Sequence, residues 1–201
     1  EANPEAQSFT HPDFDPVWER FGEKDVPVIL HIAVNGHYDP VSPSFKNNGR
    51  GSTALGGDAP DSNLGLVAMH NSAELFLSAM IFDEVFERHD RLRCLSLEHG
   101  ASWVPGWLHK LDFVERSARH ISPRNRRASD VARERVRFAP FAGEPVGWLI
   151  EQLGPEMLCF ASDYPHPEGS SDPIRKFEST MEGVEPTAVE AFYAGNVERF
   201  L

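Results

Sequence analysis

Cysteine is scarce in this chain of 201 residues, which contains only Cys94 and Cys159. Both fall in short apolar stretches that we expect to be strands, and free cysteine is among the most buried residue types. We therefore expect two buried, inert thiols rather than a disulfide framework. This low cysteine content fits a reducing, cytoplasmic location.

Long apolar runs and an excess of positive charge are also missing. No apolar run approaches the roughly 18 residues of a transmembrane helix, so the sequence predicts no membrane span. The 19 Lys and Arg against 31 Asp and Glu give a net charge of −12. This charge argues against nucleic acid and against anionic lipid as partners. A content of 40% hydrophobic and 25% charged residues is ordinary for a globular domain, and we expect residues 1–201 to form one domain.

Short apolar segments alternate with helical patterns along the chain. The expected strands are Val26–Ile32, Arg91–Leu97, Val136–Phe141 and Met157–Ala161. The expected helices cover residues 15–21, 64–89, 103–119, 144–153, 173–181 and 187–200, whereas 121–135 reads as a solvated connector or helix face. This order predicts an α/β fold with parallel strands and right-handed crossover helices, in four strand–helix units.

Residues with metal-binding and acid–base chemistry stand where two of these strands end. His31 ends the first strand, and Asp163 follows the last one, before a Pro-rich loop. Because the carboxyl ends of parallel strands meet at one edge of a sheet, we expect both side chains to converge on a shared site that suits a metal ion. The alternatives are an ordinary loop histidine and an Asx-turn at Asp163.

Further candidates lie beside these strand ends. Glu98 and His99 end the second strand, and strand alternation lets only one of them point inward. His166 and Glu168 lie in the loop after Asp163, where they would contact substrate or hold the loop. Trp103 is a candidate substrate contact, although packing against Trp107, four residues later on a helix, is the simpler interpretation.

The segment 35–63 is a long loop inserted after the first strand. It is dominated by Gly, Ser, Pro, Asn and Asp. Loops of this length are usually functional or disordered, so we expect a lid or pocket wall, a disordered segment or a subunit contact.

Four sequence motifs, in this order, resemble a known family. They are Asp13–Trp18 with the adjoining Pro27–His31, then Glu98–Trp103, Ser162–Gly169 and Asn196–Phe200. The chain resembles the amidohydrolase-related metal-dependent hydrolases and decarboxylases, in the branch that includes aminocarboxymuconate semialdehyde decarboxylase. The motif Ser162–Gly169 is the most specific of the four.

The resemblance implies a fold and exposes an absence. Family members are TIM barrels, which typically need roughly 250 residues and which open with a His-x-His metal pair on the first strand. No His-x-His occurs here, and the match begins just before the family's fifth strand. The chain also begins with Glu rather than Met, so we expect a trimmed or incomplete barrel. The expected fold is the C-terminal (β/α)4 half of a TIM barrel.

The resemblance also implies roles for individual residues. His31 matches the metal-binding histidine of the fifth strand, and Asp163 matches the carboxylate of the eighth strand, which lies at the metal and acts as general base. His99 matches a catalytic histidine of some decarboxylases, whereas Glu98 matches members with Glu-x-Gly. Of the two we favour His99 as the catalytic acid or base, with Glu98 orienting a neighbour. A divalent metal is implied, with zinc as first choice.

Two functions follow as expectations. The first is a metal-dependent hydrolase or non-oxidative decarboxylase that acts on a small carboxylated organic compound. The second is a non-catalytic half-barrel, because two protein ligands are too few for a tight catalytic zinc site. Such a half would expose sheet edges and pair with a second copy or with an N-terminal half.

Overall fold

Three parallel strands form an open sheet at the centre of the computed structural model, which describes residues 7–31, 42–47, 49, 51, 62–166 and 169–201. The strands are β1 (Val28–Leu30), β2 (Cys94–Ser96) and β3 (Val136–Phe138), and they lie in chain order with β2 in the middle. Val28 pairs with Cys94, which in turn pairs with Val136. The expected α/β fold with parallel strands is confirmed.

The fourth expected strand, Met157–Ala161, is reduced to a single parallel bridge. The Phe138 N–H donates to the Met157 carbonyl, and the Phe138 carbonyl accepts a hydrogen bond from the Cys159 N–H. These two bonds give the parallel bridge between Phe138 and Leu158. Phe160, the residue after Cys159, donates its N–H to the carbonyl of Phe192 instead. The N–H of Phe160 is thus bonded to the C-terminal helical segment and is not available to extend the strand.

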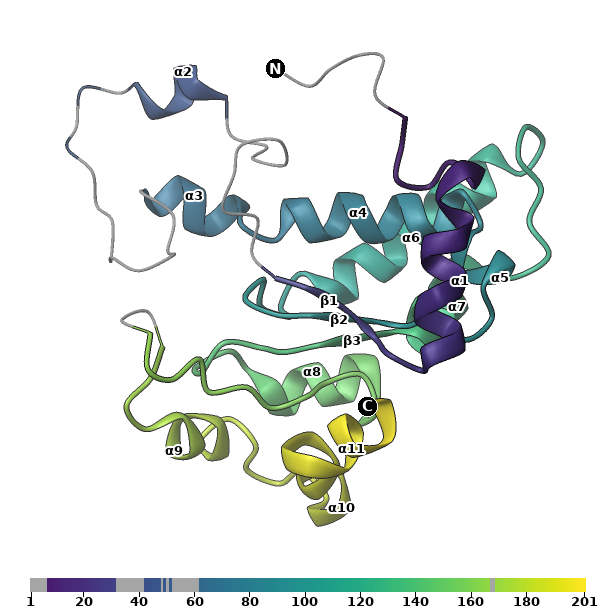
Figure 1. Cartoon of the computed structure of the whole chain (residues 1–201). Coiled ribbons are helices and arrows are strands. Elements are labelled where there is room, and N and C mark those ends of the chain that lie inside the picture. The colour runs from purple at the N-terminus through teal and green to yellow at the C-terminus, as the bar shows by residue number, and fades with distance from the viewer. Residues whose placement is uncertain (1–6, 32–41, 48, 50, 52–61, 167–168) are drawn as a thin grey trace.

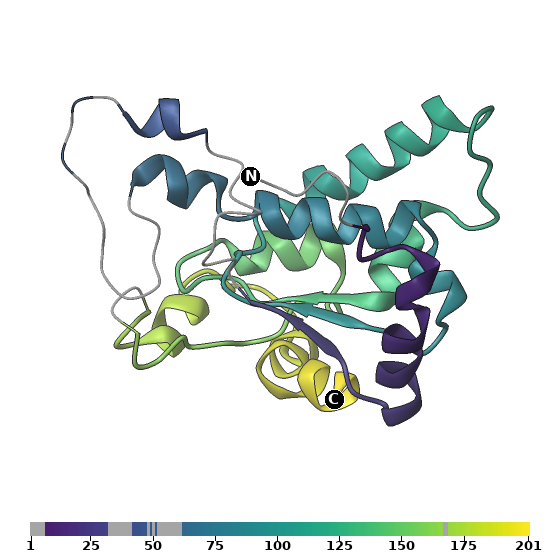
Figure 2. The same cartoon turned by 45° about the horizontal axis from the view of Figure 1, so that its top comes forward.

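Helices connect and cover the strands. Before β2 they are α1 (Asp15–Lys24), α2 (Pro43–Lys46), α3 (Asn63–Ala68), α4 (Asn71–Phe82) and α5 (Val85–Arg88). Between β2 and β3 they are α6 (Val104–Ala118) and α7 (Ala128–Arg135). After β3 they are α8 (Val146–Leu153), α9 (Pro173–Glu178), α10 (Pro186–Glu190) and α11 (Asn196–Phe200), with a π-helical turn, η2 (Ala191–Gly195), before α11. In Figures 1 and 2, α4 and α6 lie on one side of the sheet and α10 and α11 on the other.

The single helix expected over residues 64–89 is divided into α3, α4 and α5. The first break lies at Met69 and His70, where the Ser72 hydroxyl donates to the Met69 carbonyl. The second lies at Glu84, whose φ of 57° is left-handed. Asn63–Phe82 is long and apolar enough to cross a membrane by length and composition, contrary to the expectation from the sequence. One such stretch is weak evidence for a span, since core helices share this composition, and α4 buries four apolar residues.

The hydrophobic core lies between the sheet and helices α4–α8, and it extends to α9 and η2. Its largest buried side chains include Phe86, Trp107 and Phe138, and Trp107 also donates its indole N–H to the Ser78 hydroxyl at 2.9 Å. The segment 121–135, expected as a connector or solvated face, forms α7 and buries three apolar residues there. Cys94 and Cys159 are free and buried, as expected, and burial raises their thiol pKa values to about 12 and about 11.

Most of the segment 35–63 lies outside the described residues, so its expected role as a lid or pocket wall remains a prediction. Within it the structure describes the short helix α2 (Pro43–Lys46).

Asn196 ties the C-terminal helix to the bridge segment. Its side chain is buried, and its Nδ2 donates to the carbonyls of Pro155 at 2.6 Å and Leu158 at 2.7 Å. Its Oδ1 accepts a hydrogen bond from Arg199 at 2.6 Å. One amide therefore satisfies two backbone carbonyls, one before and one within the bridge segment.

We predict that Asn196→Ala destabilises the protein by about 2–3 kcal/mol, because two buried carbonyls lose their donor. Urea unfolding followed by far-UV circular dichroism measures the change. Asn47→Ala, at an exposed position, is the matched control and should stay within about 0.5 kcal/mol of the unmodified protein. Equal stabilities for the two variants would contradict the role given to Asn196.

Candidate functional site

A cavity of about 420 Å³ lies at the C-terminal ends of the strands. His31 directly follows β1, Glu98 lies two residues after β2, and Asp163 follows the bridge segment. All three line this cavity, as expected for the carboxyl edge of a parallel sheet. Leu66 and Met69 contribute an apolar wall, and Lys176 of α9 contributes a cationic side chain.

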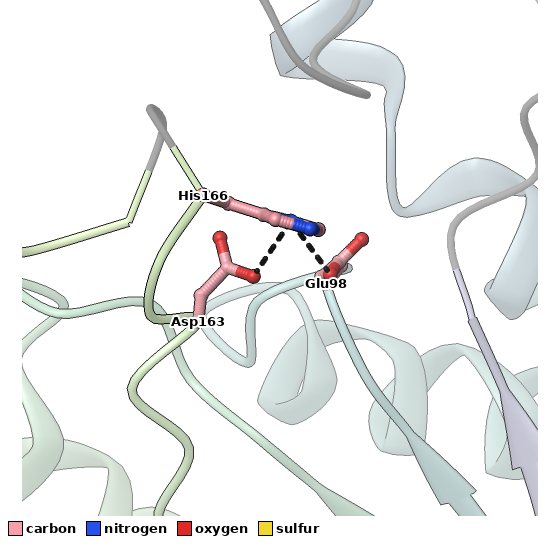
Figure 3. Close-up of side chains that lie close together, drawn as sticks. All are labelled: Glu98, Asp163 and His166. Atoms are coloured by element: carbon pink, nitrogen blue, oxygen red, sulfur yellow. Dashed lines mark ion pairs between the residues drawn. The ribbon is translucent and has the colours of Figure 1, made fainter.

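The side chains of Glu98, Asp163 and His166 converge (Figure 3), and the two carboxylates line this cavity. One ligand atom from each lies within 4.8 Å of the others. His166 Nδ1 is 3.2 Å from Asp163 Oδ1 and 3.8 Å from Glu98 Oε1. Two carboxylates and one imidazole thus face the same small volume.

His31 reaches the same cluster from β1. Its Nε2 lies 3.1 Å from Glu98 Oε1. Glu98 therefore contacts histidines from both sides, His31 from the first strand and His166 from the last loop. The structure brings together His31, Glu98, Asp163 and His166, four residues that the sequence singled out.

Glu98 and Asp163 both adopt a left-handed backbone conformation. Glu98 has a φ of 59° and Asp163 a φ of 54°. This conformation costs a non-glycine residue roughly 1–2 kcal/mol, and such outliers gather at functional sites. The strained turns begin where the strands stop, so each carboxylate sits at the rim of the sheet.

Glu144, which sequence reasoning missed, holds the turn after Glu98. Its carboxylate accepts the backbone N–H groups of Ala101, Ser102 and Phe141, at 2.6–3.1 Å. The Glu144 carboxylate therefore links the β2–α6 turn to the β3–α8 turn, and it accepts hydrogen bonds from the backbone N–H groups that precede α6. Its sequence signal is weak, because an acidic residue before a helix is common.

Trp103 holds the same turn from the other side. Its indole N–H lies 3.1 Å from the carbonyls of His99 and Gly100, and its ring stacks on His70 and packs edge-on against Phe138. Trp103 is not among the described residues that line the cavity. The geometry favours its packing interpretation, and its contact with substrate remains a prediction.

The loop after Asp163 is closed tightly by Gly169. His166 donates its N–H to the Asp163 carbonyl at 2.9 Å, and Gly169 donates to the His166 carbonyl at 3.0 Å. A Cβ at position 169 would stand 2.5 Å from the Asp163 carbonyl oxygen, so glycine is required there. Glu168, a predicted substrate contact, lies outside the described residues.

His99 lies outside the carboxylate cluster. It is buried, its Nδ1 is 3.0 Å from the Ser96 hydroxyl, and burial lowers its pKa to about 4. Its imidazole is therefore neutral near pH 7. Of the two residues at the end of β2, the structure places Glu98 in the cavity, and the catalytic role predicted for His99 remains a prediction.

Burial and the neighbouring carboxylate set the electrostatics of Glu98. Its pKa is raised, first by burial and then by Asp163, while His31 and His166 partly offset this rise. Asp163 Oδ2 is buried and has no hydrogen-bond partner among the described residues. An orphaned carboxylate oxygen beside a second carboxylate and imidazole nitrogens is a donor set that fits a divalent cation.

The matching family model agrees with this geometry. The model of the amidohydrolase family matches residues 2–201, so the chain belongs to this family. No curated protein matches the chain.

Solved structures show the same fold. An amidohydrolase from Mycobacterium avium subsp. paratuberculosis matches at 22% identity with a TM-score of 0.79, over 96% of this chain and 47% of its own. The 5-carboxyvanillate decarboxylase of Sphingomonas paucimobilis matches at 20% identity with a TM-score of 0.70, and the match covers 100% of this chain and 56% of the decarboxylase. The 2,6-dihydroxybenzoate decarboxylase of Rhizobium matches at 18% identity with a TM-score of 0.71, and the match covers 100% of this chain and 58% of the decarboxylase. The chain thus spans about half the length of these proteins and has the fold of part of a TIM barrel.

We predict that Glu98→Gln raises the thermal stability at pH 7 in EDTA, and that this gain shrinks as the pH falls. A carboxyl whose pKa is raised in the folded state favours folding only while it is protonated, and this contribution is lost as the pH rises through that raised value. The neutral amide removes this dependence. Melting temperatures between pH 4 and 8 measure the effect.

Glu151→Gln, on the exposed face of α8, is the control for this experiment and should show no comparable gain at pH 7. A Glu98→Gln variant that is less stable at pH 7 and equally stable at pH 4 would reverse the predicted sign.

Proposed function

We propose that this chain carries part of the active site of a metal-dependent, non-oxidative decarboxylase or hydrolase that acts on a small carboxylated, cyclic or unsaturated compound. The observation that carries the proposal is the convergence of Glu98, Asp163 and His166 beside a cavity at the carboxyl edge of the sheet, which the two carboxylates line. Family membership and the decarboxylases among the similar structures support it.

In this proposal Asp163, Glu98 and the imidazoles of His31 and His166 hold a divalent metal ion. The ion would supply a positive charge that polarises a bound carboxylate or water. Zinc was the expectation from the sequence, but a dihydroxybenzoate decarboxylase from Polaromonas, another similar structure, carries manganese. Carboxylates suit manganese and imidazoles suit zinc, so both ions belong in the test.

Asp163 is the proton carrier in either reaction. Loss of CO2 leaves an electron pair on the substrate carbon, and a proton must replace the carboxyl group there. Hydrolysis instead requires a base that takes a proton from water. The Asp163 carboxylate suits both tasks, since the residue lines the cavity and its Oδ1 lies 3.2 Å from His166 Nδ1.

The cavity walls define the substrate that fits. Leu66, Met69 and Phe141 offer apolar contact, whereas Lys176 places a cation at the wall. A flat, mostly apolar molecule with an anionic group would match this combination. We extend the proposal to a cytoplasmic location, which the two free thiols favour.

We predict that Asp163→Asn weakens manganese and zinc binding at least tenfold, because an amide cannot supply the anionic oxygen. Calorimetric titration of each metal into EDTA-treated, dialysed protein measures this. Asp130→Asn, at an exposed position on α7, is the charge-matched control and should bind as the unmodified protein does.

Activity is tested by release of CO2 from 2,6-dihydroxybenzoate and 5-carboxyvanillate with metal present and after EDTA treatment. Equal metal affinities of Asp163→Asn and Asp130→Asn would refute the metal site. Metal binding without turnover would favour the second function.

That second function is a half-barrel that acts only when paired. Strand β1 pairs with β2 alone among the described strands, and its Ile29 is 44% exposed. An exposed apolar edge strand is a surface for association. The chain also spans only about half of its structural relatives.

We predict a concentration-dependent dimer that Ile29→Lys shifts toward monomer, because a charge on the edge strand opposes pairing. Light scattering after size exclusion measures the mass. Val67→Lys places the same charge on α3, where the valine is 71% exposed, and should leave the mass unchanged. A monomer at all concentrations would refute self-pairing.

A further inference from the structure

A second hollow of about 250 Å³ is lined mainly by arginine. It lies between the end of α6 and the start of α7, and its charged residues are Asp112, Glu115, Arg116, Arg119, Arg124, Arg126 and Arg127. Figure 1 shows the connection between these helices beyond the N-terminal ends of the strands, whereas the candidate active site lies at their C-terminal ends. The hollow is therefore separate from the metal cluster.

Its charge is opposite to that of the whole protein. Five arginines and two carboxylates leave an excess of three positive charges in the lining, while the chain carries a net charge of −12. The two carboxylates are turned inward: Glu115 accepts the N–H of Ala128 at 2.7 Å, and Asp112 accepts from Arg127 Nε at 2.9 Å. Through backbone N–H groups of Ala128 and Ser129, these two carboxylates hold the start of α7.

Two arginines of the hollow are only weakly engaged by its carboxylates. Arg124 pairs with Glu87, Arg126 with Glu134 and Arg127 with Asp112. Arg119, whose side chain is 70% exposed, makes a long ion pair of 4.0 Å with Glu115, and Arg116 makes no hydrogen bond or ion pair with any described residue. At the back of the hollow, Arg124 is 2% exposed and its Nε is buried without a hydrogen-bond partner among the described residues.

We infer that this arginine hollow binds a compact polyanion that carries phosphate groups, with Arg116 and Arg119 as its main contacts. Guanidinium groups match phosphate oxygens through paired N–H donors. A small hollow on an acidic protein favours a small ligand over a nucleic acid, which needs an extended basic surface. Binding here would act on a face away from the candidate active site, where an effector does not compete with substrate.

Calorimetric titration with inorganic pyrophosphate tests this inference. EDTA in the buffer removes metal ions, so that pyrophosphate cannot bind through a metal at the carboxylate cluster. We expect saturable one-to-one binding, at least tenfold weaker in Arg116→Ala/Arg119→Ala. Arg116→Lys/Arg119→Lys keeps the charge but removes the paired donors, and it should bind with intermediate affinity. Arg20→Ala/Arg91→Ala removes two exposed arginines elsewhere, and it should stay within twofold of the unmodified protein.

Four outcomes would overturn the inference. The first is an absence of saturation, and the second is an equal loss of affinity in the control pair. The third is the same heat signal from sodium chloride at matched ionic strength. Binding of a single-stranded oligonucleotide without binding of pyrophosphate would also refute a compact ligand. Melting curves of each variant confirm that the fold is kept.

Discussion

Two carboxylates held close together, Glu98 and Asp163, form the constraint on which the rest of the site depends. Each is less than one-fifth exposed, and their like charges repel. Two imidazoles, from His31 and His166, face this pair and partly compensate it. The arrangement is most favourable when a cation or a shared proton is present, and both are what metal-assisted acid–base chemistry requires.

Much of the nearby structure serves to hold these carboxylates in place. Glu98 and Asp163 adopt left-handed backbone, and their turns are kept by contacts outside the cluster. Glu144 accepts hydrogen bonds from two turns at once, and Gly169 allows the loop to close against Asp163. The site is thus built on strand ends and fixed by loop contacts, so loop changes would alter its chemistry without disturbing the core.

The sequence predicted which residues would meet wherever geometry follows from strand order. Parallel strands bring their ends together, so the meeting of residues after β1, β2 and the bridge segment needed no knowledge of loops. The choice between Glu98 and His99 was different. It depends on the left-handed turn at Glu98, and nothing in the local residue pattern specifies that backbone conformation. The role of Glu144 could not be predicted for a related reason, since the N–H groups of Ala101 and Ser102 that it binds lie far from it in the sequence.

Errors in the predicted elements have tertiary causes. Apolar periodicity over residues 64–89 is continuous, but the break at Met69 and His70 places Met69 in the cavity wall while α4 packs in the core. A straight helix could not serve both surfaces.

The shortened last strand is the same kind of effect and bears on the half-barrel question. In a closed barrel each strand has two neighbours. Here the segment at Leu158 bonds to β3 on one side, and Phe160 turns to the helical residue Phe192. The C-terminal helices thereby satisfy part of the backbone at this end of the sheet. At the other end, β1 has no neighbour beyond β2 among the described strands, and its Ile29 is half exposed. The two ends of the sheet are therefore unequal, and an added partner strand would find its open backbone at β1.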